Sequence, residues 1–166
     1  MNEIFAKPGV GAIIEKICND KKYILIQDRI KENESIEIGM IEIPAGKIRE
    51  FENIFDTLRR EVREETGLNI TKIIGEEEKV VSINNGYETI SYSPFYTTQN
   101  ISGGYSIIVQ IFICHAEGEL LKGTNETANI RWELLSEVER MLVSNPEKFY
   151  PMHINTLYKY IANNHE

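Results

Sequence analysis

The sequence has few of the features that mark secreted, membrane or disulfide-stabilised proteins. It contains only two cysteines, Cys18 and Cys114, and no Cys/His spacing typical of a structural metal. No apolar run approaches the roughly 18 residues of a membrane span. The first residues also lack the basic start and long apolar core of a signal peptide. We therefore expect a cytoplasmic protein with reduced thiols and no membrane partner.

Positive charge is also scarce, and it is not clustered. Lys and Arg total 18 against 26 Asp and Glu, which gives a formal net charge of −8. Binding to duplex nucleic acid depends on clustered positive charge, so the sequence argues against such a partner. A small anionic substrate is compatible with this charge, because a bound divalent cation reverses the local field.

The order of predicted elements favours one domain over residues 1–166, with no repeat, low-complexity tract or linker dividing it. Short β-branched and apolar runs predict strands at 10–14, 23–26, 39–43, 70–74, 79–83, 87–92, 105–115 and 128–135. Helix formers predict helices at 53–66, 137–143 and 152–162, with Ser136 capping the second of these. We expect a loop over 93–104. Strands around one central helix, with helices late in the chain, predict a sheet covered on both faces.

The most informative stretch is 46–68, which reads GKIREFENIFDTLRREVREETGL. On a helix, Glu61, Glu64 and Glu65 are spaced i, i+3 and i+4, so they project within roughly a third of the circumference. Three like charges repel one another unless positive charge lies among them. The spacing shows that the three side chains can converge and that the cluster needs a cation.

An apolar stripe runs along the same predicted helix. It consists of Ile54, Phe55, Leu58 and Val62. The carboxylates adjoin this stripe instead of lying opposite it. We therefore expect the first half of the helix to pack on a core while the second half overhangs a cleft.

The pattern G-x5-E-x7-R-E-hydrophobic-x-E-E-x-G-hydrophobic is similar to the Nudix box of the Nudix hydrolases at every fixed position. Those positions are held by Gly46, Glu52, Arg60, Glu61, Val62, Glu64, Glu65, Gly67 and Leu68. The order of elements also resembles that family. The resemblance implies an α/β fold, a Nudix-type α/β/α sandwich around a mixed β-sheet. It also implies an enzyme that hydrolyses phosphoric anhydride bonds.

The resemblance implies a metal site as well. Glu61, Glu64, Glu65 and the backbone carbonyl of Gly46 would bind Mg²⁺ or Mn²⁺, hard cations that prefer oxygen ligands. Arg60 would hold a carboxylate in place by hydrogen bonds to a box glutamate, Glu52 or Glu64. The fork geometry of its guanidinium suits that role better than a lysine ammonium does.

Two residues are candidates for the general base. Glu64 could activate water directly or through the metal, whereas in parts of the Nudix family the base comes from a later loop. By sequence order the best placed later carboxylate is Glu126, ahead of Glu117 and Glu119. A base must lie within hydrogen-bond reach of the attacking water, and the sequence leaves both options open.

The segment Ile41–Lys47 resembles the E-hydrophobic-P-A-G segment of the branch that hydrolyses ADP-ribose and nucleotide sugars. Arg29, Lys47 and Arg49 are candidates for contacts with phosphates, and the alternative is that they are exposed basic residues near loops. Tyr105 belongs to an aromatic group with Tyr87, Tyr92, Phe95 and Tyr96 that either stacks on a base or fills the core and surface.

The alternatives are a nucleoside triphosphate pyrophosphohydrolase and a nucleotide-binding module with vestigial activity. All of these proteins belong to the same family. The intact box therefore does not distinguish a nucleoside triphosphate pyrophosphohydrolase from an ADP-ribose hydrolase. The family resemblance also implies a homodimer.

Overall fold

A mixed eight-stranded sheet organises the part of the chain that the computed structural model describes, residues 2–30 and 36–165. Its main path runs β10-β2-β1-β9-β5, with β3 paired to β2, β4 to β1 and β8 to β9. Strands β1 and β9 are parallel and the other pairs are antiparallel. The strands are β1 Lys7–Cys18, β2 Lys21–Arg29, β3 Ile41–Glu42, β4 Ala45–Lys47, β5 Asn69–Ile73, β8 Tyr96–Gln99, β9 Ile107–Glu117 and β10 Thr127–Leu134.

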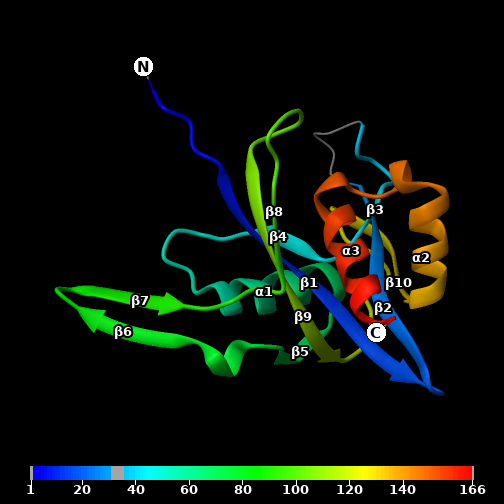
Figure 1. Cartoon of the computed structure of the whole chain (residues 1–166), viewed down its shortest axis with the longest axis horizontal. Coiled ribbons are helices and arrows are strands. Elements are labelled where there is room, and N and C mark those ends of the chain that lie inside the picture. The colour runs from blue at the N-terminus through cyan, green and yellow to red at the C-terminus, as the bar shows by residue number, and fades with distance from the viewer. Residues whose placement is uncertain (1, 31–35, 166) are drawn as a thin grey trace.

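Helices cover both faces of this sheet (Figure 1). The helices are α1 Ile54–Thr66, α2 Leu135–Ser144 and α3 Pro151–Asn163, with short 3₁₀ turns η1 Glu76–Glu78 and η2 Pro146–Lys148. One apolar cluster packs α2 and α3 on the sheet, and a second packs α1 on the other face. This arrangement confirms the predicted α/β/α sandwich around a mixed sheet.

A separate two-stranded hairpin projects from this sandwich (Figure 1). It consists of β6 Val80–Asn84 and β7 Tyr87–Ser91, joined at the predicted turn. Asn85 and Gly86 both have positive φ there, at 51° and 80°, as expected for a tight hairpin turn.

Local signals explain where α1 begins and ends. The Asn53 side chain accepts a hydrogen bond from the Phe55 N–H at 2.9 Å, which satisfies one of the free donors of the first turn. Gly67 ends the helix with φ 83°, a left-handed conformation that favours glycine, and its N–H donates to Arg63 O at 3.1 Å. The predicted apolar stripe is buried throughout, so the helix can hold the neighbouring carboxylates rigidly.

Three sequence-based expectations need correction. The loop predicted over 93–104 contains strand β8, whose partners on β9 are distant in sequence and whose polar residues gave no strand pattern. The cap predicted at Ser136 is wrong, because β10 runs directly into α2 and Leu134 is the N-cap without a side-chain hydrogen bond. The strand predicted over 39–43 is reduced to β3, since Gly39 has φ 84° and lies in a turn.

The segment between β2 and α1 brings the box together. This segment first forms β3, which pairs with β2, and then β4, which pairs with β1. In β4, Gly46 lies opposite Val10 of β1. From β4 a short loop leads into α1, which packs against β1 and β5. The end of β4 and the second half of α1 therefore face each other. Within the described ranges, no helix is long and apolar enough to cross a membrane.

Candidate active site

A cleft of about 770 Å³ opens between β4, α1 and the loops that precede β9 and β10. The leading sequence-based candidates for the site all line it, whereas the weaker base candidates Glu117 and Glu119 do not. The leading candidates are Arg29, Gly46, Arg49, Arg60, Glu61, Glu64, Glu65, Tyr105 and Glu126. The structure thus brings them together, while their chemical roles stay predictions.

Gly46 and Glu61 approach each other so closely that a side chain at position 46 would not fit. A Cβ placed on Gly46 would lie 1.9 Å from Glu61 Cδ and 2.2 Å from its Oε2. Glycine is required here for space, not for an unusual backbone conformation. The Glu61 carboxylate consequently lies directly against the β4 backbone.

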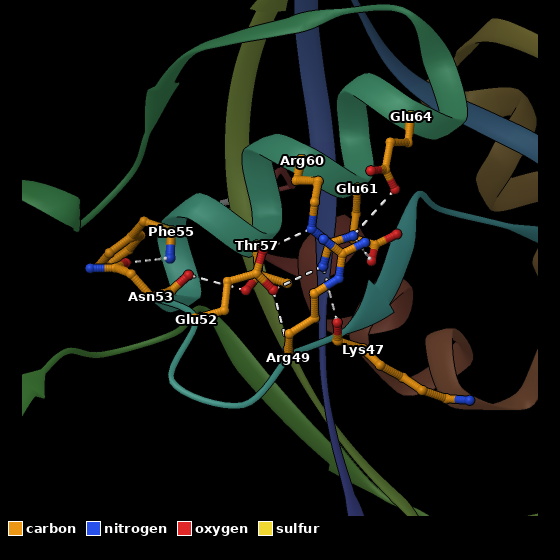
Figure 2. Close-up of polar contacts among 9 residues, drawn as sticks. All are labelled: Lys47, Arg49, Glu52, Asn53, Phe55, Thr57, Arg60, Glu61 and Glu64. Atoms are coloured by element: carbon orange, nitrogen blue, oxygen red, sulfur yellow. Dashed lines mark hydrogen bonds and ion pairs between the residues drawn. The ribbon is translucent and has the colours of Figure 1, made fainter.

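Arg60 is the centre of the charged cluster (Figure 2). Its Nε and Nη2 donate to the two carboxylate oxygens of Glu52 at 2.7 and 2.9 Å. Its Nη1 donates to Glu61 at 2.6 Å and to Glu64 at 3.2 Å. The predicted partners Glu52 and Glu64 are both contacted, and Glu61 is a third partner that the sequence did not indicate.

These contacts change the proton affinity of the pair. Hydrogen bonds from Arg60 lower the pKa of Glu52 to about 2, against an ordinary 4.5, and a backbone hydrogen bond from Arg49 adds to this effect. The same bond to Glu52 raises the pKa of Arg60. Both groups are therefore charged at neutral pH, and Arg60 supplies positive charge among the carboxylates.

The three carboxylates lie in different environments. The Glu64 side chain is 54% exposed and that of Glu61 is 14% exposed. Glu65 is only 4% exposed, and its Oε2 accepts hydrogen bonds from Gln27 Nε2 at 2.9 Å and from Ala45 N at 3.2 Å. The burial of the three carboxylates therefore increases from Glu64 through Glu61 to Glu65.

The deeper wall of the cleft contains residues that the sequence analysis missed. Arg29 Nη1 pairs with Glu42 at 3.0 Å, Arg29 Nε pairs with Glu37 at 2.8 Å, and the guanidinium carbon lies 4.4 Å from the Tyr150 ring centroid. The hydroxyl of Tyr150 lies 3.1 Å from that of Tyr105. Burial raises the pKa of Tyr150, and the contact with Tyr105 adds to this effect.

Sequence offered a weak signal for these missed residues. Glu42 is the acidic position of the E-hydrophobic-P-A-G segment, but nothing indicated its contact with Arg29. Tyr150 and His153 lie at the start of α3, about a hundred residues further on, and line the same cleft. His153 Nδ1 accepts a hydrogen bond from Ile43 N at 3.2 Å. Only the folded arrangement joins these segments.

Of the aromatic group predicted as a base platform or core, Tyr105 lines the cleft. Tyr92 packs edge-on against Phe55, with ring centroids 5.8 Å apart, and Phe95 packs on Tyr160. Tyr87 is exposed on the β6–β7 hairpin. Tyr92 and Phe95 therefore pack against other rings, and Tyr87 lies on the surface. Tyr105 is flanked by Lys47, whose Nζ lies 5.5 Å from the ring centroid.

The loop that carries Glu126 is held against α1. The Thr127 hydroxyl donates to Glu65 O at 3.3 Å, and the Glu126 N–H donates to the Thr124 hydroxyl at 3.0 Å. Glu126 O accepts from Ile30 N at 2.9 Å. Its exposed side chain borders the cleft, whereas Glu119 borders a separate, smaller pocket.

The residues fit a hard divalent cation by donor type. Glu61, Glu64 and Glu65 offer carboxylate oxygens, and the absence of a side chain on Gly46 opens the β4 backbone to Glu61. In the part of the chain that the structure describes, no three His, Cys, Asp or Glu side chains are already arranged as a metal site. Arg60 instead separates Glu61 and Glu64.

Comparison with protein families matches residues 7–153 to the family described as NUDIX domain. A comparison with curated proteins finds no match. Several solved structures share the fold. The NUDIX domain of Shewanella oneidensis NrtR, complexed with ADP ribose, has a TM-score of 0.67 and 13% identity, over 98% of this chain and 90% of that chain.

Two further structures cover almost the whole of both chains. The MutT protein from Methanosarcina mazei Go1 has a TM-score of 0.64 and 18% identity, over 96% of each chain. A C. elegans Ap4A hydrolase binary complex has a TM-score of 0.56 and 13% identity, over 96% of this chain and 98% of that chain. At such identities the likeness shows the fold, and the family match covers most of the chain and its whole box. The chain therefore belongs to the Nudix family and is a Nudix hydrolase, an enzyme that acts on phosphoric anhydride bonds.

Proposed function

We propose that this enzyme hydrolyses the pyrophosphate link of a nucleoside diphosphate derivative with Mg²⁺ or Mn²⁺, and that ADP-ribose or a nucleotide sugar is the favoured substrate. The observation that carries the proposal is that two unlike groups of side chains line one cleft. We call Glu61, Glu64 and Glu65 of α1, beside Gly46, its carboxylate half, and Tyr105 and Tyr150, whose hydroxyls are in contact, its aromatic half. A volume of about 770 Å³ accommodates a nucleotide with a second group attached.

The carboxylate half would carry the chemistry. Glu61, Glu64, Glu65 and the Gly46 carbonyl would hold the ion, which polarises a phosphoryl oxygen and lowers the pKa of a bound water. Arg60 orients Glu61 and Glu64 by donating to both. It also offsets part of the charge that these carboxylates concentrate.

The general base is proposed to be Glu64 or Glu126. Glu64 is the most exposed carboxylate of the trio and would take a proton from water on the α1 side. Glu126 would do so from the facing loop, whose backbone is fixed between Ile30 and Thr124. Comparing the pH–rate profiles of Glu64→Gln and Glu126→Gln separates the two, because the base is the residue whose loss removes the acidic limb.

The aromatic half would bind the nucleotide. The Tyr105 ring, over which Lys47 Nζ lies at 5.5 Å, lines the cleft, and the exposed Arg49 side chain lines it as well and can meet phosphate. Arg29 is buried and its charge is opposed by Glu37 and Glu42. We therefore assign Arg29 to holding Tyr150 in place instead of neutralising a phosphate.

The second candidate is a nucleoside triphosphate pyrophosphohydrolase. The match with a MutT protein is compatible with it, and the match with a domain complexed with ADP ribose is compatible with the first. The cleft's second, aromatic half favours a substrate with a group beyond the diphosphate. A nucleotide-binding member of the family whose hydrolytic activity is only vestigial is the third possibility.

A substrate panel distinguishes all three. The purified protein is incubated with Mg²⁺ and ADP-ribose, nucleotide sugars, dinucleoside polyphosphates or (d)NTPs, and the products are resolved by chromatography. AMP with a sugar phosphate supports the first candidate, whereas a monophosphate with pyrophosphate supports the second. Tight binding with no turnover, in Mg²⁺ or Mn²⁺, supports the third.

Three broader expectations belong to this proposal. We propose a single catalytic domain over residues 1–166, acting in the cytoplasm, where the two free thiols Cys18 and Cys114 are stable. We also propose a homodimer. Light scattering coupled to size-exclusion chromatography measures the mass directly and tests this last point.

A further inference from the structure

Gln27 is a polar residue at a position where the strand pattern calls for an apolar one. It lies on β2 and is fully buried. Side chains alternate along a strand, so Gln27 shares a face with Leu25, which packs in the α1 cluster. Its neighbour across the sheet is Glu42 of β3. A buried amide at such a place needs specific hydrogen-bond partners.

Both partners of Gln27 are carboxylates. Its Nε2 donates to Glu65 Oε2 at 2.9 Å and to Glu42 Oε1 at 3.3 Å. A primary amide nitrogen carries two hydrogens, so one atom can serve both carboxylates at once. Turning the amide over would place its oxygen against two negative groups, and electrostatics therefore fix the orientation. The Oε1 atom is buried and makes no hydrogen bond within the described residues.

Gln27 lies behind the cleft and does not line it, whereas Glu42 and Glu65 both do. Glu42 also accepts a hydrogen bond from Arg29 at 3.0 Å, and Glu65 also accepts one from the Ala45 N–H at 3.2 Å. Gln27 is thus the shared contact between the innermost box carboxylate and the Arg29–Tyr150 side. It can affect a bound ion or nucleotide only through these residues.

We infer that Gln27 is a positioning residue for Glu65, whose carboxylate it orients toward a divalent cation in the cleft. This inference rests on the proposed metal-dependent function. Two donors, Gln27 and the Ala45 N–H, fix Oε2 of Glu65 and so set the direction of its other oxygen. Without the amide, the donor that Glu65 and Glu42 share is lost, the two like charges repel each other, and Glu65 turns away from the site.

The test replaces the amide by a side chain of similar length without donors, Gln27→Met. We measure Mn²⁺ binding to the substrate-free protein by electron paramagnetic resonance, and kcat and KM separately. Loss of a group that hydrogen-bonds a metal ligand lowers metal affinity by about 10- to 100-fold. We expect Mn²⁺ affinity and kcat to fall in that range, with a smaller change in KM for the nucleotide.

Gln110→Met is the matched control. Gln110 lies on β9 opposite Val10 and Thr97, is partly exposed and does not line the cleft. The Gln110→Met variant makes the same chemical change elsewhere in the sheet, so it should leave Mn²⁺ affinity unchanged. Gln27→Asn, which keeps an amide but shortens its reach, replaces Gln27→Met in every measurement if the latter does not fold.

A double-mutant cycle decides whether Gln27 acts through Glu65. In a Glu65→Gln background, the Gln27 substitution should lower Mn²⁺ affinity by less than two-fold, because the oriented carboxylate is already gone. Wild-type affinity in the single variant, or full additivity in the double variant, would overturn the inference. Failure of the proposed function looks different, since the wild type itself would then show neither Mn²⁺ binding nor hydrolysis.

Discussion

Arg60 and Glu52 are joined by two parallel hydrogen bonds, from Nε at 2.7 Å and from Nη2 at 2.9 Å. The third nitrogen of the guanidinium reaches Glu61 and Glu64. One residue thus connects the loop before α1 with two carboxylates on the helix. Replacing Arg60 should therefore disturb the site more than the fold.

The variant Arg60→Lys keeps the charge but loses the fork. We expect kcat to fall by about 10- to 100-fold, because an ammonium cannot donate to Glu52 and to the helix carboxylates in fixed directions. Arg59→Lys is the matched control, since Arg59 also binds a glutamate, Glu76, through both terminal nitrogens. Steady-state kinetics showing equal losses in the two variants would contradict a special role for Arg60.

The pair Arg60–Glu52 also predicts a pH dependence of stability. The pKa of Glu52 is lowered from 4.5 to about 2 in the folded protein, so the folded state holds this proton less tightly than the unfolded state. Its stabilising contribution is complete above about pH 4.5 and is lost as the pH falls toward 2. Urea unfolding of the wild type and Glu52→Gln should show a stability difference that shrinks over that window. A difference independent of pH would contradict the assignment.

The buried and exposed carboxylates should respond differently to the same substitution. Glu64→Gln is expected to change the free energy of unfolding by less than about 0.5 kcal/mol, since Glu64 is largely exposed. Glu65→Gln should lower the free energy of unfolding by about 1–3 kcal/mol. The reason is that the new amide NH₂ group can face Gln27 Nε2 and the Ala45 N–H, which are also donors. Thermal and urea unfolding of the metal-free proteins measure these changes in the free energy of unfolding.

Both variants should nevertheless lose activity. We expect kcat to fall by about 10²- to 10⁴-fold for Glu64→Gln, and comparably for Glu65→Gln, with circular dichroism confirming folded protein. Full activity of either variant at saturating Mg²⁺ would remove that residue from the proposed mechanism.

Gly46→Ala should inactivate the enzyme by displacing Glu61. The added Cβ would lie 1.9 Å from Glu61 Cδ, so the carboxylate must leave its place beside β4. We expect a loss in kcat of about 10-fold or more. Adding Glu61→Gln to this variant should cost little further activity, and a strictly additive loss would show that Gly46 acts in some other way.

Removal of divalent metal should abolish activity and leave the fold intact. Arg60 already places positive charge among the carboxylates, so the cluster does not need a metal to remain folded. Treatment with a chelator should stop hydrolysis while the melting temperature falls only by the stabilisation that the bound ion provided. Unfolding on chelation would contradict this view, and restored activity after adding Mg²⁺ is the control.

The elements defined by local chemistry were predictable from sequence. Asn53 and Gly67 marked both ends of α1, and the box on it placed Glu61, Glu64 and Glu65 correctly at one cleft. These features depend on residues close together in the chain. The same holds for the β6–β7 hairpin, whose Asn-Gly turn is a local signal.

What could not be predicted depends on contacts between distant segments. β8 is a strand because β9 pairs with it, although its own residues are mostly polar and exposed. The link from Glu65 through Gln27 to Glu42 requires the register of β2 with β3 and the packing of α1 on the sheet. Tyr150, the N-cap of α3, meets Tyr105 only when the start of α3 has packed in the folded chain.

The two halves of the cleft are carried by different kinds of backbone. The carboxylates of α1 project from a helix anchored by a buried stripe, whereas Arg49 and Tyr105 project from connecting segments. Insertions and substitutions in connecting segments are tolerated far better than changes in a packed helix. Evolution, or a protein engineer, can therefore exchange the accepted nucleotide while inheriting the hydrolytic machinery unchanged.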